Sequence, residues 1–212
     1  MNLFITLIIT FAYSTMTSCS PTGVTRSTRG AEDLVQILGS IKSTTNQALV
    51  TFISSYMDCT DIDDCLVEST SLELAKLPTA LINTDNSEWA TVFTDNMNGL
   101  QDFNFYLQKA FGPEGYGAGK FPAIGNDLTD VTSLLSTFMK DFKLDMQNAY
   151  CLSIDVKDLS ELEPCAVCTN PTLPSHSLEI VRNYKFLMQL SNYLDDFYNK
   201  YNTFIHTTNT CS

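Results

Sequence analysis

The sequence is poor in basic residues. It has 12 Lys and Arg residues against 24 Asp and Glu residues, which gives a net charge of −12 at pH 7. Nucleic-acid binding depends on clustered positive side chains that displace counterions from the phosphate backbone, and attraction to an anionic lipid surface needs similar clusters. The charge balance therefore argues against nucleic acid and against a membrane surface as partners. It does not indicate which protein would bind.

Motifs of known catalytic sites are also missing. The chain has only 2 His residues, His176 and His206, and neither stands in a His-Glu-x-x-His motif or is placed by a motif near a Cys or Ser nucleophile. There is no Gly-x-Ser-x-Gly elbow. The Gly-rich stretch 112–125 does not match a phosphate-binding loop, because Lys120 is followed by Phe121 rather than by Ser or Thr. We therefore expect no enzyme, no metal and no cofactor.

Long apolar runs are scarce, and the first one lies at the N-terminus. Leu3 to Phe11 is an apolar run of nine residues that small polar residues follow. This pattern is typical of a secretory signal peptide, although no Lys or Arg precedes the run. The alternative is a buried N-terminal strand, since a bilayer span needs about 20 apolar residues. We predict a signal peptide over 1–20, a single domain over 21–212, secretion, and no membrane insertion.

Secretion makes the seven cysteines informative. Removal of Cys19 with the signal peptide would leave an even number, suited to three disulfides in an oxidising compartment, whereas retention would leave one unpaired thiol. The pair Cys165 and Cys168 also has the Cys-x-x-Cys spacing of redox and zinc sites. The residues around it lack the strand and helix of a redox motif, so we favour structural disulfides. The candidates are Cys59, Cys65, Cys151, Cys165, Cys168 and Cys211.

Four segments carry the three-and-four spacing of apolar residues that predicts an amphipathic helix. The most regular is 88–111, whose 24 residues would form a helix roughly 36 Å long. Its apolar positions are Trp89, Val92, Phe93, Met97, Leu100, Phe103, Leu107, Ala110 and Phe111. Similar patterns predict helices over 31–57, 126–152 and 176–204. Residues 21–30 lack this spacing, and we expect a flexible lead-in there.

The lengths of the connections favour one topology. Antiparallel neighbours need about 2–8 connecting residues, but the first and third connections (58–87 and 153–175) are several times longer. Roughly 11–12 extended residues suffice to travel the length of such a helix. We therefore predict an all-α, up-up-down-down four-helix bundle with long first and third crossover loops. The alternative is an up-down-up-down bundle with long loops.

This topology narrows the disulfide pairings. Cys151 and Cys211 would lie at the same end of the bundle, which makes them a sensible pair, since bonded cysteines need Cα atoms within about 7 Å. Cys59 and Cys65 would lie beyond the other end of the first helix. They can pair with each other or with Cys165 and Cys168, and the sequence does not distinguish between these pairings.

The chain resembles the interleukin-6-type cytokines. The segment 77–111, which contains Leu77-Pro78, Trp89 and Tyr106-Leu107, is similar to the late first loop and second helix of the ciliary neurotrophic factor and cardiotrophin-like branch. IVRNYKFLMQLSNYL (180–194) is similar to the last helix of the family, and LDMQNAYC (144–151) to oncostatin M. The resemblance covers about residues 31–205. It implies the long-chain helical cytokine fold.

The resemblance also implies a function and candidate binding residues. It implies a secreted, monomeric ligand that clusters extracellular domains of class I cytokine receptors, including the shared signal-transducing subunit of the family. Where the neurotrophic and leukaemia-inhibitory branch has Phe-x-x-Lys, this chain has Ser177 and Ile180. For an epitope near the start of the last helix the candidates are Leu178, Tyr116 and Phe121, with a core role as the alternative for Leu178. For an epitope on the first and third helices they are Gln36, Lys42, Asp130 and Lys140.

Two other functions fit the same predicted fold. The first is a secreted helical carrier that holds a small apolar ligand among its Phe, Tyr and Met side chains, which a cavity inside the bundle would favour. The second is a receptor antagonist that lacks one epitope. A tightly filled core favours a receptor ligand over a carrier.

Overall fold

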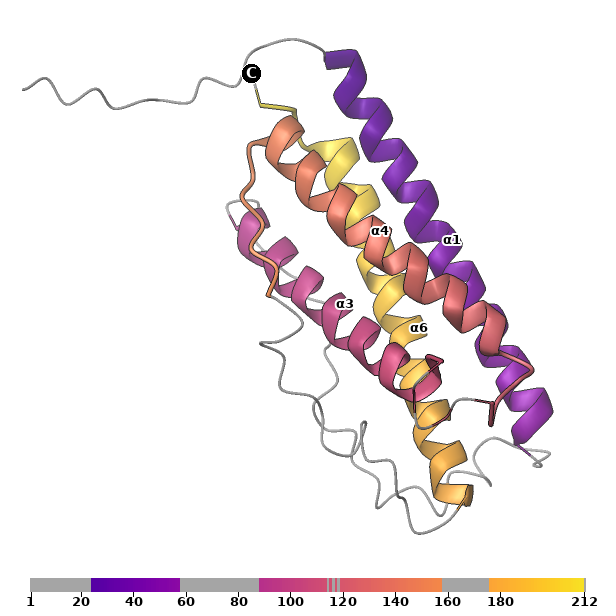
Figure 1. Cartoon of the computed structure of the whole chain (residues 1–212). Helices are drawn as coiled ribbons and strands as arrows, with labels where there is room; N and C mark the ends of the chain where they lie inside the picture. Colours follow the sequence, from indigo (N-terminus) through magenta and orange to yellow (C-terminus); the bar gives the residue numbers. More distant parts are fainter. Residues whose placement is uncertain are drawn as a thin grey trace, which may run out of the picture.

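The structure, a computed structural model, describes residues 24–57, 88–113, 115, 117, 119–157 and 176–211. The regular elements within these residues are all α-helices, and strands are absent from them. They are α1 (Val24–Tyr56), α3 (Trp89–Phe111), α4 (Gly125–Tyr150) and α6 (His176–Thr207) (Figure 1). The prediction of an all-α fold with four helices is therefore confirmed.

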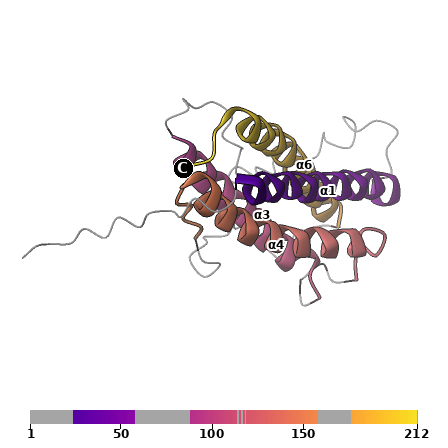
Figure 2. The same cartoon turned by 90° about the horizontal axis from the view of Figure 1, so that it is seen from above.

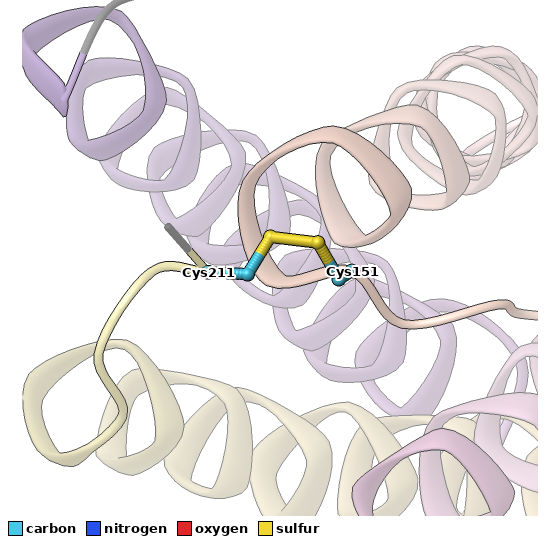
Figure 3. Close-up of a disulfide and its surroundings, with 2 residues drawn as sticks. All are labelled: Cys151 and Cys211. Carbon is cyan, nitrogen blue, oxygen red and sulfur yellow. A yellow bond between two sulfur atoms is a disulfide. The ribbon is translucent and has the colours of Figure 1, made fainter. Parts of the chain in front are cut away.

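Contacts between helix ends give the relative directions of the helices. Cys151, just after α4, is bonded to Cys211, just after α6, with Cα atoms 5.9 Å apart (Figure 3). Phe121, ahead of α4, places its ring 5.4 Å from that of Phe52 near the end of α1 and 5.8 Å from that of Phe111 at the end of α3. Thus α1 and α3 run in one direction, and α4 and α6 run in the other (Figure 1).

Aromatic rings fill the centre of the bundle. Phe93 of α3 is fully buried, and its ring centroid lies 4.8 Å from that of Phe204 in α6 and 5.2 Å from that of Phe142 in α4, both edge to face. This is the geometry that aromatic pairs prefer. Further along the seam between α3 and α6, Tyr106 stacks on Phe186. The apolar face predicted for α3 is confirmed, because its residues from Trp89 to Ala110 at that spacing are buried.

The helix α1 packs against α4 and α6, and it lies between them in the view of Figure 2. Its buried residues are aliphatic or small except for Phe52, and they include Leu38, Ile41 and Ala48.

On the other side of the molecule, the segment 151–157 leaves α4 and runs along the start of α3. There the backbone N–H of Asp155 donates to Thr94 Oγ1 at 3.2 Å. This segment closes the core at the end where α3 begins.

Several helix ends differ from the predicted ones. α1 begins at Val24 rather than 31, so the expected lead-in is partly helical and no acidic residue stands in the first turn. α3 begins at Trp89, one residue after the predicted start at 88, and α6 ends at Thr207 rather than at 204. α4 ends at Tyr150 because Cys151 takes a left-handed conformation with φ of 54°.

A buried carboxylate lies near the disulfide. Asp145 of α4 has Oδ2 buried without a hydrogen-bond partner, and burial raises the pKa of this carboxyl to about 6. On α1 the residue facing it is Gly30, where an added Cβ would lie 3.0 Å from Asp145 Oδ1. The Tyr201 hydroxyl of α6 is also buried without a partner, and its pKa is raised by burial and then by the charge of Asp145.

Removal of the disulfide should destabilise the protein by about 4 kcal/mol in the loop-entropy treatment, since the bond closes a 60-residue separation. The variant is Cys151→Ser with Cys211→Ser, measured by urea denaturation against the oxidised parent. A matched variant, Cys151→Gly with Cys211→Ser, separates the cross-link from the left-handed conformation at 151. A loss below about 1 kcal/mol in both variants would contradict a stabilising role.

Stability should fall as pH rises from about 4 to about 6. The carboxyl of Asp145 titrates near 3.8 in the unfolded chain and near 6 in the fold, so the folded state binds more protons in this window. Because the side chain is only half-buried, solvent screening reduces the effect, so Asp145→Asn should remove this slope and raise the free energy of unfolding at pH 7 by on the order of 1–2 kcal/mol. Urea denaturation between pH 4 and 7 measures both effects. Asp130→Asn, at an exposed position of the same helix, serves as control and should leave the slope in place.

Candidate functional site

Three of the four residues predicted for an epitope on α1 and α4 lie at the surface. Gln36 of α1 and Asp130 and Lys140 of α4 are all exposed. The two helices are antiparallel, and at the far end from Gly30 the Tyr56 hydroxyl accepts a hydrogen bond of 2.9 Å from the backbone N–H of Ala123. This register places Gln36 level with Lys140. We call the exposed residues of α1 from Gln36 to Ser55, together with Asp130 and Lys140 of α4, the α1/α4 face.

Lys42, the fourth residue, lies on the other flank of α1. Its Nζ lies 2.6 Å from Asp195 Oδ1 of α6 and 5.0 Å from the centre of the Tyr198 ring. Both partners belong to the seam between α1 and α6. An exposed pair of this kind contributes little stability, about 0–1 kcal/mol. Lys42 is therefore part of an intramolecular contact and does not share the α1/α4 face.

The exposed surface of α1 carries very little charge for a chain of net charge −12. From Leu34 to Tyr56 the helix has one charged residue, the paired Lys42. Val50 is 61% exposed. The other exposed residues of this stretch are Gln36, Ser40, Ser43, Gln47, Ser54 and Ser55. Depletion of charge is a feature of the centre of protein interfaces, and the sequence already displays this signal.

The apolar candidates Phe121 and Leu178 lie at the end of the bundle where α4 begins, and neither is fully exposed. Phe121 is only 2% exposed, and its ring also lies 5.2 Å from that of Tyr56. It is a core residue, because the connection folds back over the ends of α1 and α3. Leu178 in the first turn of α6 is half-buried. Tyr116 lies outside the described residues, as do Cys59, Cys65, Cys165, Cys168 and the predicted signal peptide.

An ionic cluster at this end escaped prediction. Glu179 of α6 is 8% exposed, and its Oε1 lies 2.9 Å from Lys120 Nζ and 3.8 Å from Arg182 Nη2. Its other oxygen lies 3.6 Å from His176 Nδ1. Arg182 is completely buried, which requires a charge partner. The signal in the sequence is the Glu179 and Arg182 pair, three residues apart on an otherwise apolar stretch.

A neighbouring hydrogen bond ties α3 to the same turn of α6. The Tyr106 hydroxyl donates to Asn183 Oδ1 at 2.9 Å, and both side chains are buried. Together with the link from Lys120 to Glu179, this bond joins α3, the connection to α4, and α6. The cluster therefore fixes the shape of this end of the bundle.

A groove of about 570 Å³ lies between the end of α3 and the start of α4. It opens to solvent, since Gln108, Lys109, Thr129 and Ser133 in its lining are exposed. Its lining does not include the central rings of Phe93, Phe142 and Phe204.

The described residues include no group of three His, Cys, Asp or Glu side chains placed to hold a metal ion. Within the same residues, every helix is too short or too polar to cross a membrane.

No family model, curated protein or solved structure matches this chain. Its function is therefore inferred from the residues and their geometry.

Glu179→Gln should lower the free energy of unfolding by about 3 kcal/mol, since it leaves the buried Arg182 without this carboxylate. Lys120→Ala is the matched control on the same carboxylate, and it should cost less than about 1 kcal/mol because the ammonium group is 43% exposed. Urea denaturation of both variants measures the difference. Equal losses would show that Arg182 does not depend on Glu179.

Proposed function

We propose that this protein is a secreted cytokine of the interleukin-6 type, which binds and clusters class I cytokine receptors on the cell surface and so triggers kinase signalling inside the cell. The observation that carries the proposal is the direction of the four helices. α1 and α3 run one way and α4 and α6 the other, across connections of 58–87 and 151–175. This supports the up-up-down-down topology of the long-chain helical cytokines.

The α1/α4 face supports a role in receptor binding. Its exposed residues on α1 are uncharged from Gln36 to Ser55, and its helices are held rigidly by a buried core. A rigid surface that is charge-poor on its α1 side loses little conformational entropy on binding and leaves few charges of α1 to desolvate. We therefore place the main receptor contact on this face, with Gln36, Asp130 and Lys140 within it.

The state of the core favours a receptor ligand over a carrier. A carrier would hold its ligand inside the bundle, where Phe93, Phe142 and Phe204 pack ring against ring. The groove of about 570 Å³ lies at the surface instead. The disulfide between Cys151 and Cys211 is consistent with secretion, because disulfides persist in oxidising compartments. The partner proposed first is the shared signal-transducing subunit of the interleukin-6 receptor family.

The test is binding of the purified, oxidised protein to immobilised extracellular domains of cytokine receptors, beginning with that shared subunit. Gln36→Glu with Gln47→Glu adds two negative charges to the α1/α4 face and should weaken binding about tenfold or more, a loss of about 1.4 kcal/mol. Asn192→Asp with Asn199→Asp adds two charges at exposed positions of α6 and should leave this contact unchanged.

Two outcomes would overturn the proposal. Absence of binding across the whole receptor panel, from a protein shown to be folded and helical by circular dichroism, would remove the cytokine function. Equal weakening by the α1 and α6 pairs of substitutions would remove the α1/α4 face as the contact surface.

A further inference from the structure

The groove between α3 and α4 has the size and lining of a small-molecule site. Its volume of about 570 Å³ falls within the usual range of roughly 300–1,000 Å³ for such sites. It is lined by Leu107, Gln108, Lys109, Phe111, Gly112, Pro113, Leu128, Thr129, Thr132 and Ser133. It lies apart from the α1/α4 face, on the side where α4 meets α3.

The floor and walls of the groove are mainly apolar. Leu107 and Leu128 are each 1% exposed and form the floor, and Phe111 is half-buried beside them. The hydroxyls of Thr129 and Thr132 both donate to backbone carbonyls of α4 at 2.8 Å. Their donors are therefore used within the helix, and a hydrocarbon body can lie against this wall without leaving those donors unsatisfied.

One positive charge stands at the groove. Lys109 is the single charged residue among the described lining residues. Its Nζ lies 5.6 Å from the centre of the Phe105 ring, and no carboxylate of the described residues pairs with it. The amide of the neighbouring Gln108 is a further donor. Phe105 is not among the lining residues, so a carboxylate in the groove would draw the Lys109 ammonium group away from this ring and toward itself.

We infer that this groove binds a small molecule with an apolar body and one carboxylate. The hydrocarbon part lies over Leu107, Leu128 and Phe111, and the carboxylate pairs with the ammonium group of Lys109. None of the lining residues is one of the three residues placed in the receptor contact, Gln36, Asp130 and Lys140.

The experiment compares decanoate with decanol, which share a hydrocarbon chain and differ in charge. Each is titrated into the full, oxidised protein while backbone amide shifts are followed by NMR. Decanoate should bind saturably, with the largest shifts at Leu107 to Gly112 and Leu128 to Ser133, and with higher affinity than decanol. Lys109→Gln should weaken decanoate binding about tenfold and leave decanol binding unchanged.

Two further variants sharpen the test. Lys143→Gln removes an exposed positive charge from α4 outside the groove and should leave decanoate binding unchanged. Thr132→Phe fills the groove and should abolish binding of both probes in a protein whose circular dichroism is unaltered. The proposal is overturned if neither probe binds saturably, if the shifts map elsewhere, or if Lys109→Gln and Lys143→Gln act alike.

Discussion

The packing of aromatic rings between α3 and its neighbours is the contact on which the rest of the molecule depends. The Phe93 ring lies against rings from α4 and α6 at once, so a single side chain couples three helices. Aromatic pairs of this kind contribute about 0.5–1.5 kcal/mol each beyond their burial. They also fill the space that would otherwise separate α3 from α6. These rings fill the space between α3, α4 and α6 among the described residues, and the groove beside α3 and α4 opens at the surface.

The two ends of the bundle are closed by different chemistry. At one end a covalent bond joins the residues that follow α4 and α6, and the backbone N–H of Cys211 donates to the carbonyl of Ala149 at 2.9 Å. At the other end Glu179 joins Lys120 to the buried Arg182. The first closure depends on redox state and the second on charge, so the two ends respond to different conditions.

The helices themselves were largely predictable from the sequence, since apolar spacing reports burial directly. The predicted start of α1 is wrong because residues 24–30 lack the apolar spacing on which the prediction depends, although the helix includes them. The site was less predictable. Periodicity places Lys42 on a flank of α1 but does not show which neighbour it faces, and the Gly-rich composition around Phe121 does not reveal that its ring is buried. Arg182 was not predicted as a buried residue, because the sequence does not show that its guanidinium group lies close to the Glu179 carboxylate inside the bundle.

The two ends of the bundle differ in what they carry. Gly30 lies against the last turns of α4, and Cys211 lies beside Ala149, so the start of α1 and the end of the described chain share one end of the bundle (Figure 1). The groove and the ionic cluster lie at the other end. A reporter domain or surface tether attached after Cys211 would therefore stand a full helix length, roughly 36 Å for a helix such as α3, from both of them. A molecule tethered in this way would present its groove outward to the solution.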